Sequence, residues 1–366
     1  MKKILKLTLS LFLILSSLAL ACTGITIKTL DNKIVQGRTI EYGESNLNSK
    51  LVVSPRGKEY QSLTPDGKLA GYKWKGKYGY VGASLITDMF IGEGINEAGL
   101  NAGLFYFPHY GSLTKYDKKI SKKSIVDMQV VSWILSNFAT VDEVKEGLKK
   151  IKVVNIGYDE KGNPLPTAHW RVADSKGGNI VIEIVNNGEV KIHDNKIGVL
   201  TNSPDYQWHV KNLNNYINLY AGNVKNFNVN GQEFFSFGAG TGAMGLPGDI
   251  TPPSRFVRAF YFLNTMKPAE TSKEAINEAF HILNNFDLPI GVEYPAEHKS
   301  YIPKDLPSAT QWTAISSLND REFYYKTMYN SQIRKVDLKK IDFSTVKYTV
   351  LPLDEKPEEN IQEITF

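Results

Sequence analysis

The residue with the most direct chemical potential is Cys22, the single cysteine of the 366-residue chain. It follows a stretch typical of a secretory leader, with three lysines among the first six residues, an apolar run over 7–20, and the small-x-small cleavage site Ala19-Leu20-Ala21. Cleavage after Ala21 would make Cys22 the first residue. Its thiol would be a nucleophile, and its own α-amino group, with an ordinary pKa of about 7.7–8.0, a general base. We therefore predict a hydrolase with an N-terminal cysteine nucleophile.

The same position has a second interpretation. A cysteine directly after a leader is also the residue that bacterial lipoproteins acylate, and acylation of sulfur and amine would abolish both catalytic functions. The alternative is a lipid-anchored cell-envelope binding protein with acylated Cys22. Two features weigh against it: the residue three positions before Cys22 is Ala19 rather than the usual Leu, and Cys22-Thr23-Gly24 runs straight into a predicted strand instead of a flexible tether.

Composition excludes several classes of function. A single cysteine cannot form an internal disulfide. The first 21 residues carry three of the 43 Lys and Arg and none of the 38 Asp and Glu, so the remaining chain has a net charge of about +2. This balance argues against nucleic-acid and membrane partners. After the leader, no apolar run approaches the ~18 residues of a membrane span. We expect an exported protein, periplasmic or secreted, with no membrane association unless it is lipidated.

Other catalytic systems lack their motifs. The six histidines show no metal-ligand spacing, and no Gly-x-Ser-x-Gly is present. The run Gly238–Gly248 lacks the Gly-Lys-Ser/Thr ending of a phosphate-binding loop, and we interpret it as a tight loop that shapes the site. We expect no metal and no organic cofactor.

The elements that must position Cys22 follow from periodicity. Alternating apolar residues on either side of Asp31-Asn32 predict a first hairpin, so the chain enters a sheet directly after Cys22. Apolar, Gly-rich segments over 78–107 predict further strands. Alternation over 170–192, with turns at Gly177-Gly178 and Asn187-Gly188, predicts more.

Helices are predicted between and after these strands. The first has the helical spacing of Ile125, Met128, Val131, Leu135 and Phe138. Capping boxes at Thr140/Glu143 and Thr271/Glu274 begin two others, and a further helix starts after Pro253. Strands, helices, strands and helices in this order fit an α+β protein with stacked antiparallel sheets and helices outside. A polar tail begins at about residue 354.

Several separated blocks resemble the choloylglycine hydrolase family, which includes conjugated bile salt hydrolases and penicillin V acylases, within the N-terminal-nucleophile (Ntn) hydrolase superfamily. The blocks are Cys22-Thr-Gly, Gly37-Arg-Thr-Ile-Glu41, Ser54-Pro-Arg-Gly57, Gly94-Ile-Asn-Glu-Ala-Gly99 through Gly103-Leu104, Leu200-Thr-Asn-Ser-Pro204, and Gly238–Asp249 running into Pro253–Arg258. Their order and spacing are specific, although each block alone is weak. They cover most of the chain after residue 21.

The resemblance implies a four-layer αββα Ntn hydrolase fold in one domain over 22–366, with the core of the fold ending at about 350. It implies hydrolysis of linear, non-peptide amide C–N bonds of small N-acyl compounds with an apolar acyl group. Glycine- or taurine-conjugated bile acids, penicillin V and acyl-homoserine lactones are such compounds. It also implies a homotetramer.

Six residues of this chain, the first of them Cys22, fall at the family's catalytic positions. Arg38 would favour the thiolate of Cys22 and lower its pKa, Asn202 would donate to the oxyanion, and Arg255 would supply a fixed positive charge. On the residues alone, Arg38 reads as a strand-end arginine, Asn202 as a turn residue before Ser-Pro, and Arg255 as part of an ordinary helix start.

The remaining two positions depart from the family pattern. Glu41 stands where the family usually has an aspartate that orients the amino group, so a third possibility is a relative that has lost activity through this change. Where bile salt hydrolases tend to have Asn after Gly-Leu, this chain has Gly103-Leu-Phe-Tyr-Phe107. Tyr106 is the candidate second oxyanion donor, closer to the penicillin V acylase pattern, unless these aromatic residues only line the acyl pocket.

Overall fold

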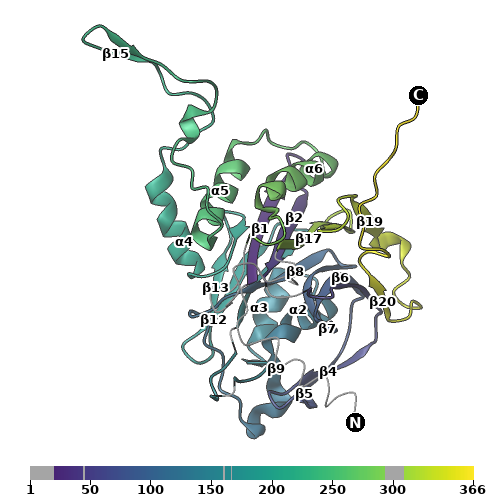
Figure 1. The fold of residues 1–366 in the computed structure, drawn as a ribbon. Helices are drawn as coiled ribbons and strands as arrows, with labels where there is room; N and C mark the ends of the chain where they lie inside the picture. Colours follow the sequence, from purple (N-terminus) through teal and green to yellow (C-terminus); the bar gives the residue numbers. More distant parts are fainter. Residues whose placement is uncertain (1–19, 44–45, 160, 166, 293–308) are drawn as a thin grey trace.

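The computed structural model describes residues 20–43, 46–159, 161–165, 167–292 and 309–366 (Figure 1). The predicted leader therefore lies almost entirely outside the described residues. Two large antiparallel sheets stack face to face, and helices cover their outer faces (Figure 1). This is the predicted αββα arrangement.

The first sheet carries the amino-terminal strands. It has six strands in the order β14-β1-β2-β17-β18-β19. Their bounds are β1 (Leu20–Lys28), β2 (Ile34–Tyr42), β14 (Val199–Leu200), β17 (Ala309–Ser317), β18 (Glu322–Thr327) and β19 (Arg334–Asp337). β1 is thus a central strand, paired with β2 on one side and with β14 on the other, which fixes the position of Cys22.

The second sheet packs against the inner face of the first. It has eight strands in the order β13-β12-β11-β8-β7-β6-β3-β20. They are β3 (Lys50–Ser54), β6 (Tyr80–Leu85), β7 (Thr87–Asn96), β8 (Leu100–Tyr106), β11 (Ala168–Asp174), β12 (Asn179–Val185), β13 (Glu189–Asp194) and β20 (Thr349–Pro352). β1 and β17 lie against β8 and β7 across the interface.

Three two-stranded ribbons complete the strands of the described residues. They are β4 (Glu59–Leu63) with β5 (Leu69–Lys75), β9 (Ser124–Val126) with β10 (Lys152–Val154), and β15 (Phe227–Val229) with β16 (Gln232–Phe234). Only the β9–β10 pair is parallel among the described ladders.

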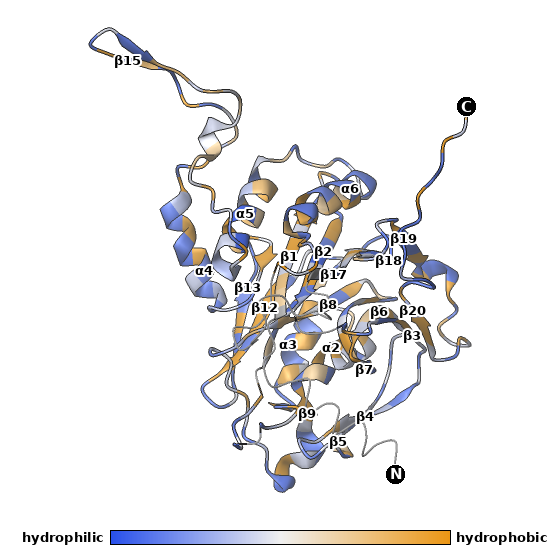
Figure 2. Ribbon diagram, viewed as in Figure 1, coloured by the Kyte–Doolittle hydropathy of each residue, from blue (hydrophilic) through white to orange (hydrophobic). Residues whose placement is uncertain are grey.

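Helices form the two outer layers. α5 (Pro252–Thr265) and α6 (Ser272–Leu283) cover the first sheet, and α2 (Val130–Asn137) and α3 (Val141–Leu148) cover the second, while α4 (Tyr206–Asn212) packs beside α5. Short 3₁₀ turns are η1 (Lys118–Lys123), η2 (Asp127–Gln129), η3 (Leu213–Tyr216), η4 (Thr241–Ala243), η5 (Asn284–Phe286) and η6 (Leu338–Lys340). Figure 2 shows apolar residues concentrated in β1, β2 and α2, whereas α4 is largely hydrophilic. Among the helices that the structure describes, none has the length and apolarity needed to cross a bilayer.

Several local predictions are confirmed. The first hairpin is β1–β2, and Asn32 adopts a left-handed φ of 63° in its turn. Thr140 accepts a hydrogen bond from the Glu143 N–H at 3.2 Å, and Thr271 does the same for Glu274 at 3.3 Å. These side chains satisfy amide groups that a helix start leaves unpaired.

Two local predictions are wrong. The helix expected from Ile125 begins only at Val130, because residues 124–126 pair with β10 as strand β9 and residues 127–129 form a 3₁₀ turn. Most of Gly238–Gly248 does not shape the site. It belongs to an arm, residues 222–245, that carries β15 and β16 and projects from the body (Figure 1).

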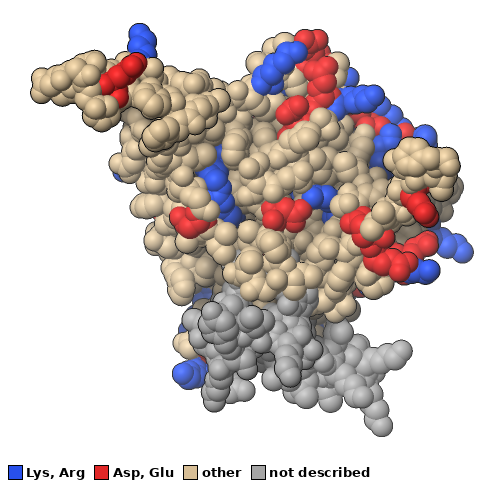
Figure 3. All heavy atoms as spheres, turned by 45° about the horizontal axis from the view of Figure 1, so that its top comes forward, with Lys and Arg blue, Asp and Glu red and all other residues tan. Residues whose placement is uncertain are grey.

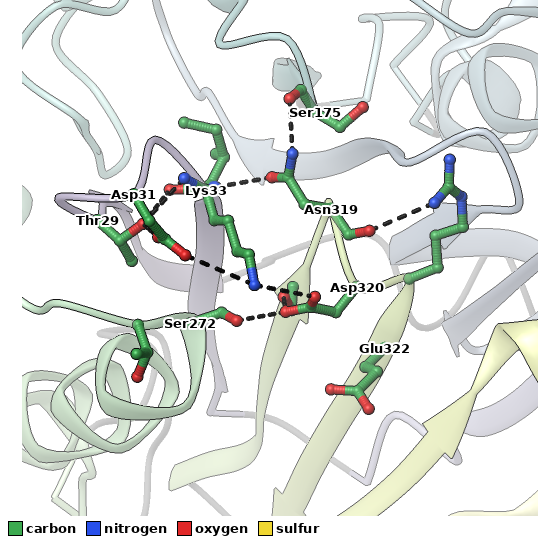
Figure 4. Close-up of polar contacts among 12 residues, drawn as sticks. Thr29, Asp31, Lys33, Ser175, Ser272, Asn319, Asp320 and Glu322 are labelled. Carbon is green, nitrogen blue, oxygen red and sulfur yellow. Dashed lines mark hydrogen bonds and ion pairs between the residues drawn. The ribbon is translucent and has the colours of Figure 1, made fainter.

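The end of the sandwich at the β1–β2 turn is closed by polar contacts (Figure 4). Asn319 accepts from the Ile34 N–H at 2.9 Å and donates to the Ser175 carbonyl at 2.9 Å, which joins both sheets. Asp320 accepts from Ser272 at the start of α6 and pairs with Lys33 at 3.5 Å. These contacts tie the β1–β2 turn to the outer helix layer.

Candidate active site

Strand register places Cys22 beside Arg38. Cys22 is opposite Ile40 and Gly24 is opposite Arg38 in the β1–β2 ladder. Opposite residues share a face and alternate residues return to it, so Cys22 and Arg38 both point into the space between the sheets. The Arg38 Nη2 group donates to the Cys22 sulfur at 2.7 Å.

The second sheet holds the Arg38 guanidinium rigidly. Its Nη1 donates to the carbonyl oxygens of Gly92 at 3.0 Å and Leu104 at 2.5 Å. The Phe105 ring lies 4.3 Å from its central carbon, and the Glu93 carboxylate lies 3.9 Å from Nη1. Arg38 is completely buried, so its charge is little screened by solvent.

The thiol of Cys22 does not have the lowered pKa that the sequence predicts. Burial is the dominant influence and raises the pKa of the thiol, Arg38 and Arg255 oppose it, and the Glu41 carboxylate raises the pKa further. The net direction is upward, because the sulfur is desolvated with only 1% of the residue exposed. The predicted influence of Arg38 is present, but in the full-length chain burial is stronger.

Asn202 joins three parts of the site. Its Oδ1 accepts from the backbone nitrogen of Cys22 at 2.8 Å and from Arg255 Nη2 at 2.7 Å, and its Nδ2 donates to the Tyr106 carbonyl at 2.9 Å. Two donors face one end of the amide and an acceptor faces the other, which fixes its orientation. Asn202 is buried directly after the short strand β14.

Arg255 reaches the site from the first turn of α5. Its Nη1 donates to the Cys22 carbonyl oxygen and, at 2.8 Å, to the Thr23 hydroxyl. Its Nε donates to the Ile250 carbonyl at 2.8 Å, so the segment before α5 orients the guanidinium. α5 thus contributes a buried cation that holds the main chain of Cys22 in place.

Glu41 and Tyr106 lie at the edge of the cluster formed by Cys22, Arg38, Asn202 and Arg255. The Glu41 Oε1 accepts from Thr310 Oγ1 of β17 at 3.2 Å, and its charge acts on the Cys22 thiol. The backbone N–H of Tyr106 favours the thiolate of Cys22, while the residue itself lines a surface cavity. The structure therefore brings all six predicted residues together. Direct hydrogen bonds connect Cys22, Arg38, Asn202, Arg255 and the Tyr106 main chain, and Glu41 acts on the thiol through its charge.

The cavity beside Tyr106 has a volume of about 630 Å³, within the range typical of small-molecule sites. Apolar side chains of Tyr106, Leu113 and Leu165 line it together with polar Lys115 and Asn155. Phe105 and Phe107 are fully buried instead, against Arg38 and His169 respectively, so Tyr106 alone of these three aromatic residues lines the cavity.

Comparison with known proteins identifies the family. The family model of linear amide C–N hydrolases, choloylglycine hydrolase family, matches residues 22–351. The chain belongs to the choloylglycine hydrolase family. It is therefore an amidohydrolase that acts on linear amides, with an Ntn hydrolase fold.

Individual relatives of this choloylglycine hydrolase family member support the family assignment. It is 36% identical to the bile salt hydrolase/transferase of Clostridium perfringens, over 87% of this chain and 93% of the relative. A crystal structure of a variant of the conjugated bile acid hydrolase from the same organism superimposes with a TM-score of 0.79, at 32% identity over 94% of this chain and 100% of the other. The penicillin V acylase of Pectobacterium atrosepticum is 26% identical over 94% of this chain and 88% of that protein.

The family member also contains buried polar residues near the site that the sequence analysis missed. His169 and Arg171 alternate along β11 and face the first sheet, and Glu93 of β7 lies 3.4 Å from Arg171. Arg171 Nη1 donates to the carbonyls of Ile25 and Gly37, at 3.0 and 3.1 Å, and so holds the strands that carry Cys22 and Arg38. Charged residues at alternate positions of a predicted strand were the available signal.

Proposed function

We propose that Cys22, freed by removal of residues 1–21, is the N-terminal nucleophile of this amidohydrolase. The observation that carries the proposal is the arrangement around one residue. The Cys22 sulfur lies 2.7 Å from a buried arginine nitrogen, and its backbone nitrogen lies 2.8 Å from Asn202 Oδ1. A nucleophile and its base would then occupy fixed positions inside a hydrolase fold.

The reaction proceeds by acyl transfer. The free amine of Cys22 accepts the thiol proton, and the thiolate, paired with Arg38, attacks the amide carbonyl carbon. The second hydrogen of Asn202 Nδ2 and the Tyr106 N–H donate to the resulting oxyanion. As the C–N bond breaks, the Cys22 ammonium returns the proton to the leaving amine. Water then attacks the thioester, giving its proton to the amine, and the acid leaves with regeneration of the thiol.

Glu41 and Arg255 prepare the amine for this role. The Glu41 carboxylate would hold the ammonium of Cys22 by a charge-assisted hydrogen bond. Arg255 donates to the Cys22 carbonyl oxygen and to Asn202 Oδ1, and so fixes the orientation of Cys22. The family's usual aspartate is replaced here by a side chain that is one methylene longer.

Conjugated bile acids are the substrate class we propose first. Support comes from the 36% identity to a bile salt hydrolase/transferase and from the ~630 Å³ cavity beside Tyr106. Penicillin V is a second candidate, because the tyrosine at position 106 fits the penicillin V acylase pattern better.

A direct assay separates these substrates. Purified residues 22–366 are given taurocholate and penicillin V side by side, and release of taurine or of 6-aminopenicillanic acid is measured. Cys22→Ala should abolish turnover and keep the melting temperature close to that of the parent, while Cys22→Ser should lose most activity because a hydroxyl is a poorer nucleophile. Substantial hydrolysis by the alanine variant would refute the thiol as the attacking group.

Export and processing form part of the proposal. The secreted or periplasmic protein should begin at an unmodified Cys22. Intact mass and N-terminal sequencing of exported material check this. A diacylglyceryl mass increment would support the lipid-anchored binding protein instead, and normal turnover by an uncleaved chain would contradict the free amine as base.

We propose that the arm formed by residues 222–245 assembles the homotetramer. It carries two charged residues, Lys225 and Glu233, and exposes several large apolar side chains. These are Val224, Phe227, Val229, Phe234, Phe235, Phe237 and Met244. Phe237 is 98% exposed, and Figure 3 shows few charges on the projecting arm. Large exposed apolar side chains gathered on one projecting segment are typical of an interface.

Light scattering during size-exclusion chromatography tests the arm. The parent should elute as a tetramer, and Phe235→Ser with Phe237→Ser should dissociate it. Leu30→Ser, at an exposed leucine in the β1–β2 turn, is the matched control and should remain tetrameric. A monomeric parent, or a tetramer unaffected by the arm substitutions, would refute the assignment.

A further inference from the structure

Two buried histidines donate to consecutive carbonyl oxygens on either side of the Asn202 α-carbon. His169 Nε2 lies 3.0 Å from the Thr201 oxygen, and His209 Nε2 lies 2.9 Å from the Asn202 oxygen. Both rings are fully buried. A carbonyl oxygen can only accept, so each of these ring nitrogens must carry a hydrogen. The rings come from different elements, His169 from β11 and His209 from α4.

Glu183 of β12 orients the first of these rings. Its Oε1 lies 3.4 Å from His169 Nδ1 and accepts from the Tyr206 N–H at 2.7 Å, and its Oε2 lies 3.2 Å from His193 Nε2. The His169 ring also stacks on Phe107, with the ring centres 4.3 Å apart. The carboxylate and the aromatic ring together leave His169 one orientation.

Hydrogen-bond chemistry assigns a shared proton to this pair. Because His169 Nε2 already donates to Thr201, its Nδ1 can face Glu183 favourably only if a further proton lies between them. His169 and Glu183 thus form a charge-assisted contact inside the protein. Such a contact is directional and holds the donor on Thr201 more firmly than a neutral ring would.

His209 is held by a different environment. Its ring stacks on Phe256 of α5 at 4.7 Å between ring centres. Burial lowers the pKa of His209 to about 4, so the ring is neutral near pH 7. A neutral ring that donates through Nε2 has a defined tautomer, and the Asn202 oxygen receives that hydrogen.

The Thr201–Asn202 segment needs the support of these two histidines. Thr201 and Asn202 follow a strand of only two residues and precede α4. The side chain of Asn202 must meet Cys22, Arg255 and Tyr106 at once. A loop left to itself would be the most mobile part of such a site, and small displacements of a positioned group reduce rates strongly.

We propose that His169, His209 and Glu183 are positioning residues, which fix the Thr201–Asn202 main chain so that the Asn202 amide meets the oxyanion. This rests on the proposed function, in which Asn202 donates to the oxyanion. None of the three residues is assigned a contact with the substrate. The three act together as a clamp on the loop, and the clamp is expected to act on kcat rather than on substrate affinity.

Substitutions that keep the ring stacks and remove the donors test the clamp. His209→Phe and His169→Phe each leave one carbonyl without its donor, and His209→Gln restores a donor on a flexible side chain. Glu183→Gln keeps the shape and removes the charge. Tyr206→Phe is the matched control, since it removes a nearby buried hydrogen bond, Tyr206 to Asn195 at 3.0 Å, without touching Thr201 or Asn202.

Three quantities are measured on residues 22–366 with taurocholate or penicillin V, whichever the parent hydrolyses: kcat, KM and the rate of Cys22 alkylation by iodoacetamide. In each phenylalanine variant kcat should fall by about ten-fold or more, with KM and alkylation rate within about two-fold of the parent, because the sulfur and Arg38 are untouched. His209→Gln should recover part of the loss. Glu183→Gln keeps both rings, and its kcat should fall by about three-fold or more. This variant provides the test where a phenylalanine variant does not fold.

The outcomes are distinct. An active parent whose Glu183→Gln and foldable phenylalanine variants keep full kcat would overturn the clamp and leave the proposed function standing. Equal losses of kcat and of alkylation rate would also overturn it, because they indicate general damage to the site. A parent that hydrolyses neither substrate would overturn the proposed function, and the clamp with it.

Discussion

The Arg38 guanidinium lies 2.7 Å from the Cys22 sulfur, yet the pKa of this thiol is raised above its ordinary value. Burial of the sulfur between two sheets disfavours the thiolate more than one adjacent cation favours it. In the full-length chain, Arg38 therefore does not keep Cys22 in its thiolate form. The thiol needs a base at the moment of reaction, and the freed amine of Cys22 is that base in the proposed mechanism.

Removing the cation should raise the thiol pKa further. In Arg38→Met, Cys22 alkylation by iodoacetamide at pH 7 should be slower than in the parent, and its midpoint should move to higher pH. The proposed reaction should lose about 100-fold in kcat, comparable to the loss of one electrostatic stabiliser. Arg38→Lys keeps the charge and is the control. An alkylation midpoint that stays in place in the methionine variant would show that Arg38 does not act on the sulfur.

The length of the Glu41 side chain should matter. Glu41→Asp withdraws the carboxylate by one methylene, away from the Thr310 hydroxyl that it contacts at 3.2 Å. We expect kcat to fall by about ten-fold, measured on residues 22–366 with the better substrate. If the parent is inactive and the aspartate variant is active, the present sequence has lost its function at this position.

Gly24 should not tolerate a methyl group. A Cβ added there would lie 2.6 Å from Phe105 and 2.7 Å from Arg171, both in the second sheet. Gly24→Ala should lower the free energy of unfolding by about 1–3 kcal/mol through overpacking and displace the ring that supports Arg38. Urea titration measures this. Gly248→Ala, which meets no atom within 4 Å, is the control and should behave like the parent.

Acid should weaken the fold through Glu183. Burial alone would raise the pKa of this carboxyl, but hydrogen bonds with His169 and His193 lower it to about 2. A depressed folded-state pKa contributes stability above the unfolded value of about 4.5, and this is lost as pH falls toward 2. The difference in unfolding free energy between the parent and Glu183→Gln should therefore shrink between pH 5 and pH 3. A constant difference would refute ionisation of Glu183 as its source.

Much of the fold could be predicted from local patterns. The β1–β2 hairpin and the α3 and α6 starts depend on alternation and on a capping side chain a few residues away, so short windows of sequence contain them. The start of α2 could not be predicted, because residues 124–126 have helical spacing but pair with β10, about 28 residues later in the chain. Tertiary pairing overrode the periodicity.

The site could be predicted only in part from the sequence, for a similar reason. Five of the six predicted residues lie in family blocks, and Tyr106 lies two residues after one. All six lie together in the structure, although their separate roles remain predictions. Glu93, His169 and Glu183 lie in none of these family blocks. Their contacts with the site arise only when one sheet packs on the other. The direction of the Cys22 pKa also depends on burial, which the identity of neighbouring charged residues does not reveal.

The position of Ala21 has a consequence for the order of events during biogenesis. Ala21 is buried in β1 and paired with Glu41 of β2, so the peptide bond before Cys22 lies within a central strand of the finished sheet. A peptidase requires an extended, accessible segment and cannot reach it there. In the proposed maturation, cleavage before Cys22 therefore has to precede folding of this sheet. A chain that folded with residues 1–21 attached would lack the free amine that the proposed mechanism needs.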